Sequence, residues 1–312
     1  MRTMPSVRAW RAVWCLVLLL LARSSFADDG SFVRDGVTLH YRTEGSGPPV
    51  VFLSGGPGFD VDYMIPVAEF LPASYQRVFF DQRGTGRSVI PDMTADHMTL
   101  QHAVEDLEAL RISLGQDRLI LLGHSWGAML AMAYAAAHPE RVDRLVLIGS
   151  GGPTLAFAAS FQDNIRARLR PEDVEAQRYW EEAGKRGVDP DKAALEALRA
   201  IVPGYFFDRS KGLEFASQLR EGSLHPQVNT LLFQDLAKSY DVRDGIRRLD
   251  RPVLIVHGHQ DPISDRIAAD IQSLIPSSTL QFIHRAGHFP WIEQPEEFGR
   301  ILVAFFEGAA SQ

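Results

Sequence analysis

A serine flanked by glycines stands between two apolar segments near the middle of the 312-residue chain. Residues 123–127 read Gly-His-Ser-Trp-Gly; they directly follow the apolar run 119–122 and continue into an Ala- and Met-rich segment at 126–137. This motif between a strand and a helix predicts a sharp turn that exposes the serine hydroxyl, and glycines avoid the clashes that a Cβ would create there. A helix N-terminus behind the serine favours developing negative charge. Ser125 is therefore the candidate nucleophile.

A serine nucleophile needs a base, and the base needs a carboxylate that orients it. With this motif the chain order is serine, acid, histidine. Asp261 follows the apolar run 253–256, and His288 follows a predicted strand at 280–283. A single loop Asp is more often a turn residue, and a single loop His is more often a solvated side chain. Their order and their places after strands together favour function, so we predict a triad of Ser125, Asp261 and His288.

The predicted reaction also needs backbone donors for the negative oxygen of a tetrahedral intermediate. One candidate donor is the N–H of Trp126, which directly follows the nucleophile. The other comes from the glycine-rich loop 54–58, where either Gly55 or Gly56 fits. A tight turn with no further role is the alternative for this loop, but glycines suit a close approach of the backbone to a substrate.

Short apolar runs alternate with helix-like segments along most of the chain, which predicts an α/β fold with a mostly parallel sheet covered by helices on both faces. The expected strands lie at 37–41, 50–53, 78–80, 119–122, 145–148, 253–256 and 280–283, and the expected helices at 100–114, 126–137 and 295–306.

The alternation stops between residues 152 and 248, where the pattern is helical throughout. The expected helices are 155–169, 171–185, 191–201 and 228–237. We interpret 28–151 and 249–312 as the two parts of a sheet domain and 152–248 as an inserted helical cap. Such a cap is expected over the carboxyl ends of the strands, where open α/β sheets bind their ligands.

Three motifs together resemble the proline iminopeptidase family of α/β-hydrolase-fold serine peptidases. They are Ser-Gly-Gly-Pro-Gly at 54–58, Asp-Gln-Arg-Gly-Thr-Gly-Arg-Ser at 81–88 and the motif around Ser125. The resemblance covers about residues 36–150 and 250–306. It implies an α/β-hydrolase fold with a helical cap, and removal of an N-terminal residue, often proline, from short peptides. In the second motif we expect Asp81 and Arg83 to brace the turn rather than to take part in the chemistry.

The chain departs from that family at two places. Ser54 stands where the family usually has His, so the glycine loop is expected to be held differently. The family binds the substrate ammonium with cap glutamates; Glu181 resembles one of them, and Val202 stands at the other position. Glu181 is thus the candidate substrate-binding residue, with a solvated helix residue as the alternative. An ammonium without a carboxylate in a closed pocket costs on the order of 2–5 kcal/mol.

The N-terminus has the layout of a secretory signal peptide. Residues 1–27 contain four Arg and no acid, with an apolar run at 12–22 and small residues before a cleavage site near Ala27. The alternative, an uncleaved membrane anchor, is disfavoured because eleven apolar residues are too few to span a bilayer. We expect an exported protein, periplasmic or secreted, without a stable membrane span after cleavage.

Removal of this leader leaves 285 residues with 28 basic and 39 acidic side chains, a net charge of −11, and no cysteine. The segment 152–248 has 15 acidic and 15 basic side chains, so the negative charge belongs to the sheet domain. An acidic chain does not favour a nucleic-acid partner. The single cysteine belongs to the leader, so thiolate metal sites and disulfides are not expected.

The sequence predicts no cofactor and no metal site. His257 and His259 stand two positions apart, but Gly258 and the turn toward Asp261 make a continuous strand doubtful, and no third ligand is evident nearby. The expected partner is a small molecule or a short peptide. Two activities remain open: a proline iminopeptidase-like aminopeptidase, and a carboxylesterase or amide hydrolase for small uncharged substrates. A more remote alternative is a non-catalytic ligand binder.

Overall fold

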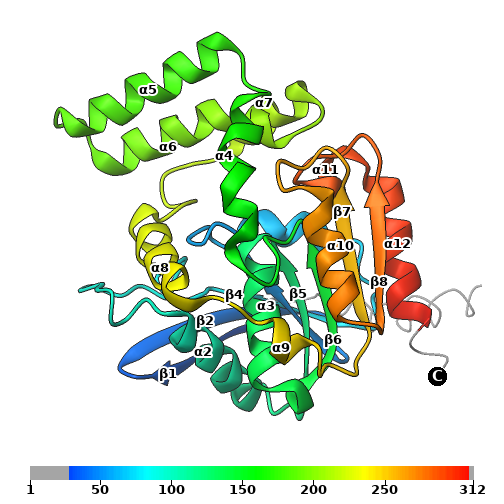
Figure 1. The fold of residues 1–312 in the computed structure, drawn as a ribbon. Coiled ribbons are helices and arrows are strands. Elements are labelled where there is room, and N and C mark those ends of the chain that lie inside the picture. Colours follow the sequence, from blue (N-terminus) through cyan, green and yellow to red (C-terminus); the bar gives the residue numbers. More distant parts are fainter. Residues whose placement is uncertain (1–27, 309–312) are drawn as a thin grey trace, which may run out of the picture.

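The computed structural model describes residues 28–308, and the predicted leader at 1–27 lies outside them. An eight-stranded sheet runs through the protein in the order β1-β2-β4-β3-β5-β6-β7-β8 (Figure 1). β1 pairs antiparallel with β2 and β2 antiparallel with β4, and the pairs from β4 to β8 are parallel. The strands are β1 Asp28–Arg34, β2 Val37–Glu44, β3 Pro49–Leu53, β4 Gln76–Phe80, β5 Leu119–His124, β6 Val142–Ile148, β7 Val253–Gly258 and β8 Ser278–Ile283.

The central strands are buried on both faces because successive side chains enter two different cores. In β3, Val51 and Leu53 belong to one cluster, and Val50 and Phe52 to the other. The first cluster is covered by helices α2 Leu100–Ser113, α3 Trp126–Ala137, α9 Arg243–Ile246 and α10 Asp265–Leu274. The second is covered by helices α1 Ile65–Ala68, α11 Pro290–Glu293 and α12 Pro295–Gly308. The predicted α/β architecture is confirmed.

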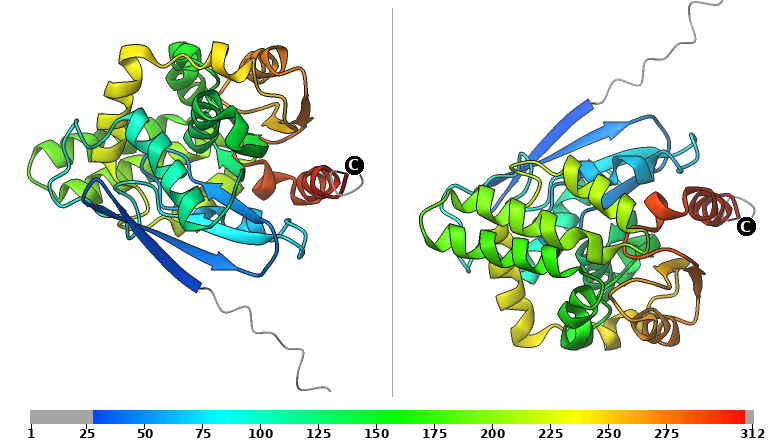
Figure 2. Two further views of the ribbon diagram at one scale, coloured as in Figure 1. Left: turned by 90° about the horizontal axis from the view of Figure 1, so that it is seen from below. Right: turned by 90° about the horizontal axis from the view of Figure 1, so that it is seen from above.

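Helices replace strands between β6 and β7, as the sequence predicts. The segment contains η3 Leu155–Phe157, α4 Ala158–Arg166, α5 Pro171–Lys185, α6 Pro190–Ile201, η4 Val202–Tyr205, α7 Arg209–Gln218 and α8 Pro226–Ser239. The views from the front and from above place α5, α6 and α7 over one end of the sheet (Figures 1 and 2). Helix α8 instead packs down onto the sheet core through Val228, Leu232 and Leu236.

The structure adds elements that the sequence reading did not include, among them β1, α7 and α10. Strand β7 includes His257 and ends at Gly258, so His259 lies beyond it and no continuous strand joins the two histidines, in agreement with the expectation. Gly258, the last residue of β7, is also a point of close approach, because a Cβ there would lie 2.2 Å from the carbonyl oxygen of Gly287. The glycine therefore lets the loop that carries His288 lie directly against β7.

Candidate active site

Ser125 occupies a strained turn between β5 and α3. Its backbone has φ 55° and ψ −115°, a conformation that costs of order 1–3 kcal/mol in a residue with a side chain. A Cβ on Gly123 would lie 2.3 Å from the carbonyl oxygen of Gly127, and one on Gly127 would lie 2.1 Å from the carbonyl oxygen of Leu53. Both glycines are therefore required by close backbone packing around the serine.

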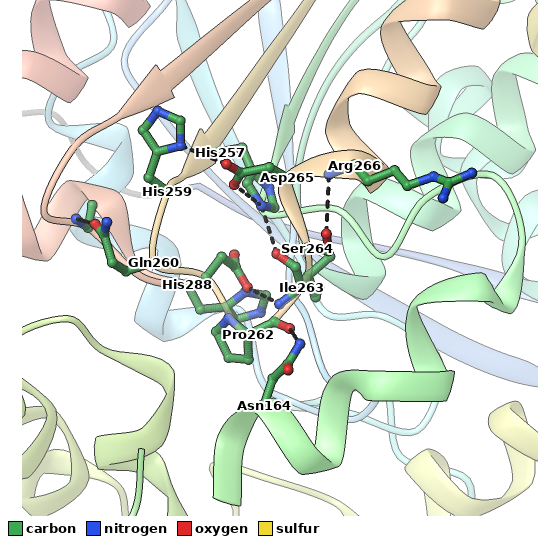
Figure 3. A network of polar contacts seen from close by, with 12 residues as sticks. Asn164, His257, His259, Gln260, Pro262, Ile263, Ser264, Asp265, Arg266 and His288 are labelled. Carbon is green, nitrogen blue, oxygen red and sulfur yellow. Dashed lines mark hydrogen bonds and ion pairs between the residues drawn. The ribbon is translucent and has the colours of Figure 1, made fainter. Parts of the chain in front are cut away.

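Asp261 and His288 form a buried pair at the ends of β7 and β8. The Oδ2 atom of Asp261 lies 2.8 Å from Nδ1 of His288, and both residues are at most 5% exposed. The other carboxylate oxygen accepts the N–H of Ile263 at 2.8 Å, which fixes the orientation of the carboxylate. Figure 3 shows His288 beside the loop 260–266. Because a carboxylate accepts, Nδ1 of His288 carries the proton and Nε2 remains able to accept one.

Ser125 and His288 open into the same cavity, whose volume is about 530 Å³. Within residues 28–308 no hydrogen bond joins the Ser125 hydroxyl to His288. Hydrogen bonds of this kind are often long before a substrate binds and shorten in the complex. The structure thus brings the three predicted triad residues to one end of the sheet, and it joins Asp261 and His288 by a hydrogen bond.

The two glycines predicted as oxyanion donors differ in their surroundings. The N–H of Gly55 donates to the Tyr63 hydroxyl at 2.6 Å. Gly56 has φ +110° and lines the cavity together with Trp126. In the part of the chain that the structure describes, the N–H groups of Gly56 and Trp126 donate to no protein group. These two N–H groups are free for a ligand, whereas that of Gly55 is taken.

Ser54 and Gln82 hold the glycine loop in place through their hydrogen bonds. Gln82 Nε2 donates to the carbonyl oxygen and to the hydroxyl of Ser54, each at 2.9 Å, and the Ser54 hydroxyl donates to the carbonyl of Phe59 at 2.7 Å. Gln82 Oε1 accepts the indole N–H of Trp126 at 2.9 Å. The loop is thus linked to the turn that carries the serine. The sequence motif that contains Gln82 gives no signal for this role, because its partners Ser54 and Trp126 are distant in the chain.

The neighbours of Gln82 brace the turn, which agrees with the role expected for them. Asp81 accepts the N–H of Arg87 at 3.1 Å. Arg83 forms a two-point ion pair with Asp106 of α2, at 2.7 and 2.6 Å, and both side chains are almost fully buried. Neither Asp81 nor Arg83 lines the cavity. The motif therefore positions the loop rather than contacting a ligand.

The helical segment is tied to both loops of the Asp261–His288 pair. The backbone N–H of His288 donates to the carbonyl of Tyr205 at 2.8 Å. Arg168 donates to the carbonyls of Gln260 and Asp261, and burial lowers the pKa of its guanidinium. Asn164 of α4 donates to the carbonyl of Pro262 at 2.8 Å (Figure 3). The helical segment thus supports the loops that carry Asp261 and His288.

Glu293 of α11 joins the helical segment to the loop before His288. One carboxylate oxygen accepts the N–H of Gly287 at 2.5 Å, and the other accepts the N–H of Asp208 at 2.7 Å. Burial raises the pKa of Glu293, and the backbone donors partly oppose this rise. The sequence contains no local signal for this contact, because its partners stand far apart in the chain.

The walls of the cavity are mostly aliphatic and aromatic, with a few uncharged polar side chains. Residues 152–248 contribute Phe157, Ala158, Phe161, Gln162, Ala194, Leu198, Ile201, Val202, Tyr205, Phe215, Leu224, Pro226, Asn229, Thr230 and Phe233. Among the described residues, no Asp, Glu, Lys or Arg lines this cavity. The walls thus suit an apolar ligand with uncharged polar groups.

Glu181 and Val202, the two cap positions singled out by the resemblance, lie in different environments. Val202 is buried and lines the cavity. Glu181 is exposed on α5, accepts a hydrogen bond from Gln177, and is not among the residues that line the cavity. The structure does not bring Glu181 to Ser125, because α5 presents this side chain to solvent.

The histidines at the end of β7 have protein partners. His257 Nε2 lies 2.9 Å from the carbonyl oxygen of Ile263, and His259 Nδ1 lies 2.7 Å from Oδ2 of Asp265 (Figure 3). Within residues 28–308 no group of three or more His, Cys, Asp or Glu side chains has the arrangement of a metal site. In the same range, no helix combines the length and apolarity required to cross a membrane.

Comparison with known proteins shows the family of this chain. The model of the α/β hydrolase fold family matches residues 48–295. The chain belongs to that family. It is a hydrolase of the proline iminopeptidase-like kind: a curated proline iminopeptidase of Xylella fastidiosa is 31% identical over 301 residues, which cover 87% of this chain and 93% of that protein. A second, from Saccharolobus solfataricus, is 27% identical over 280 residues, covering 86% and 87%.

The solved structures of similar fold agree with this assignment. The crystal structure of VinJ superimposes with a TM-score of 0.73 and 24% sequence identity, and covers 90% of this chain and 98% of that one. At this level of identity the likeness shows the α/β-hydrolase fold alone.

Proposed function

We propose that this α/β hydrolase uses Ser125, His288 and Asp261 as a catalytic triad. Ser125 Oγ attacks the carbonyl carbon of an ester or amide while its proton passes to Nε2 of His288. The C–O or C–N bond to the leaving group then breaks, and His288 returns the proton to the leaving group. Water, deprotonated by His288, cleaves the acyl-enzyme and restores the serine. Asp261 keeps His288 in the required tautomer and stabilises its charged form.

For the oxyanion we propose the N–H groups of Trp126 and Gly56. Gly55, the alternative in the same loop, is disfavoured because its N–H already donates to Tyr63. Removal of one such donor from a hydrolase costs roughly 10²- to 10³-fold in rate. Ser125, Gly56 and Trp126 line one cavity, as this role requires.

The cavity favours a substrate whose acyl group is uncharged and apolar, and this observation carries the proposal. The side chains around Ser125 are aliphatic and aromatic, with Gln162, Asn229 and Thr230 as uncharged polar groups. Apolar surface buried there contributes about 25 cal/mol per Å². A charged group would lose its hydration without a charged partner among the lining residues. We therefore propose a carboxylesterase or amide hydrolase for small uncharged substrates.

The second candidate is an aminopeptidase that releases N-terminal residues from short peptides. It is favoured by the curated proline iminopeptidases that match most of this chain. Such an enzyme must hold a free ammonium near Ser125. Val202 cannot pair with one, and Glu181 lies on the solvent side of α5. The aromatic rings of the cavity offer only the weaker attraction of a cation to a π face, of roughly 0.5–2 kcal/mol.

We further propose that residues 152–248 act as a cap on the sheet domain formed by 28–151 and 249–312, and that residues 1–27 are removed on export. The first proposal is supported by the cavity, which receives walls from both parts. The second depends on the sequence layout of the leader. Mass spectrometry of the protein recovered outside the cytoplasm tests it: a mature N-terminus at Asp28 agrees, and an intact chain in the membrane fraction contradicts it.

A matched pair of substrates separates the two activities. Alanine 2-naphthylamide and N-acetylalanine 2-naphthylamide have the same scissile bond, but only the first has a free ammonium. We expect the purified protein to cleave the acetylated substrate and p-nitrophenyl butyrate faster than the free amine. Preference for alanine or proline 2-naphthylamide by tenfold or more would instead support the aminopeptidase.

Ser125→Ala tests the triad itself, and Ser273→Ala is the control. Ser273 is exposed on α10. We expect Ser125→Ala to lose about 10⁴-fold or more of the hydrolysis, because the nucleophile is missing. Full activity in Ser125→Ala would overturn the proposed mechanism.

A further inference from the structure

A chain of three hydrogen bonds joins the glycine loop to the loop that carries His288, through Tyr63 and His124, which line the cavity with Ser125. The N–H of Gly55 donates to Oη of Tyr63 at 2.6 Å, and Oη lies 2.8 Å from Nδ1 of His124. Nε2 of His124 lies 2.9 Å from the backbone carbonyl oxygen of His288. His124 is the residue immediately before Ser125. Three segments of the site thus meet at two side chains.

The proton positions in this chain follow from its ends. A carbonyl oxygen only accepts, so Nε2 of His124 carries the proton. Burial lowers the pKa of His124 well below its usual value, with a smaller contribution from the nearby His288, so His124 is neutral and its Nδ1 has a free lone pair. Tyr63 must donate to that lone pair and accept from Gly55. Burial raises the pKa of the Tyr63 hydroxyl, which therefore stays protonated.

We propose that Tyr63 and His124 are positioning residues that set the glycine loop and His288 in register with Ser125. This inference rests on the proposed function of Ser125 and His288. The hydrogen bonds leave neither side chain a free polar atom, and such a completed buried network favours one arrangement of its members. Reacting groups must be placed within about 0.5 Å of their productive geometry, so this coupling affects rate more than binding.

Packing around the two side chains supports a rigid link. Measured between centroids, the His124 ring lies 4.9 Å from the ring of Trp291 and 5.1 Å from that of Phe289. The Tyr63 ring lies edge-on to Phe289 and stacks on Trp291. A Cβ on Gly55 would lie 3.0 Å from the Tyr63 hydroxyl and 3.1 Å from Cβ of Ser125. The close packing at Gly55 transmits any shift of Tyr63 directly to the serine.

The inference can be tested without the natural substrate, because a fluorophosphonate reports on the reactivity of the serine. Ser125 Oγ bonds to phosphorus, fluoride leaves, and the serine proton passes to His288. The limiting rate of labelling (kinact) and the half-saturating concentration (KI) separate reactivity from binding. Loss of labelling in Ser125→Ala establishes that Ser125 reacts; labelling that persists in this variant would contradict the proposed function instead of the link.

Tyr63→Phe removes the hydroxyl and keeps the ring. We expect kinact to fall about 10- to 100-fold with KI unchanged within about threefold, because the glycine loop and His288 lose the hydrogen bonds through Tyr63 that connect them. Tyr75→Phe is the control: Tyr75 is buried and its hydroxyl is also hydrogen-bonded, but its partners are Arg144 and the carbonyl of Phe306, and it does not line the cavity. A purely structural hydroxyl would lower the melting temperature in both variants and leave kinact unchanged in both.

His124→Gln completes the test as a double-mutant cycle with Tyr63→Phe. The Gln amide nitrogen is able to replace the donor to His288, but Gln offers no ring nitrogen to Tyr63. If the two residues act as one unit, the double variant loses no more than the worse single variant, within about threefold in kinact. Losses that multiply, or Tyr63→Phe with the kinact of the original protein while Ser125→Ala is unlabelled, would overturn the inference.

Discussion

The strand ends and the helical cap differ in the interactions that hold them in place. At the strand ends, Asp261 and His288 are buried and fixed by short hydrogen bonds to backbone and side-chain partners. In the cap, α5 and α6 pack chiefly against each other, and α5 buries only Asp173 and Ala183. The cap faces Ser125 mainly with apolar side chains. In the proposed function, the strand ends therefore carry out the reaction, whereas residues 152–248 select the substrate.

Among the changes that compare these two regions, the largest effect is expected at the strand ends, from Asp261→Asn. The Asn oxygen is still able to accept the N–H of Ile263, but its amide group opposes the proton on Nδ1 of His288 and favours the wrong tautomer. We expect kcat to fall about 10³- to 10⁴-fold with little change in folding. Steady-state kinetics with p-nitrophenyl butyrate measure this.

The matching change in the cap is Leu198→Ala, which removes part of a side chain that lines the cavity and so enlarges the cavity. We expect it to raise KM about 5- to 150-fold and to leave kcat nearly unchanged, since one apolar contact is worth about 1–3 kcal/mol. A loss of kcat in the cap variant as large as that in Asp261→Asn would break the division between the two regions.

The next effect concerns stability and compares one leucine from each region. Leu122 is fully buried in β5, whereas Leu213 of α7 is 48% exposed. We expect Leu122→Ala to lower the free energy of unfolding by about 2–5 kcal/mol, and Leu213→Ala by less than about 0.5 kcal/mol. Urea denaturation followed by circular dichroism measures both. Similar losses in the two variants would show that the cap contributes to the cooperative core as strongly as the sheet does.

The smallest effect lies at the contact between the two regions, at Asp60. Its N–H donates to the carbonyl of Ser223, next to α8, and burial together with the charge of Asp62 raises the pKa of its carboxyl to about 6. The unfolded chain ionises this group near pH 3.8, so the folded protein loses stability as pH rises from about 4 through 6. Asp60→Asn keeps the acceptor for the N–H of Asp62 and cannot ionise.

We therefore expect Asp60→Asn to be more stable than the original protein by about 1 kcal/mol at pH 8 and equally stable at pH 4. This difference in stability is smaller than the free energy that corresponds to the whole pKa shift of Asp60, because the carboxyl is partly solvated. Thermal melts across this pH range measure the difference, with the exposed Asp96→Asn as the control. A stability difference between the two proteins that does not change with pH would contradict the raised pKa of Asp60.

The sequence by itself determined seven of the eight strands, the helical insertion and the three candidate triad residues. These features depend on local signals: apolar strand runs, glycines where backbone segments touch, and chain order. Gly123 and Gly127 illustrate this, because their need for a missing Cβ is visible both in the motif and in the structure. The local pattern also indicated that Asp81 and Arg83 brace a turn, which their hydrogen bonds and ion pair support.

Only the tertiary structure decided how these residues are held. Tyr63, Gln82 and Glu293 join segments that are distant along the chain, and no local spacing predicts such contacts. The structure also showed that Gly55 has its N–H occupied by Tyr63, and that Glu181 is turned to solvent while Val202 faces the cavity. Sequence position places a residue on an element. Whether its side chain meets the site depends on the packing of whole elements against one another, which is set by long-range burial.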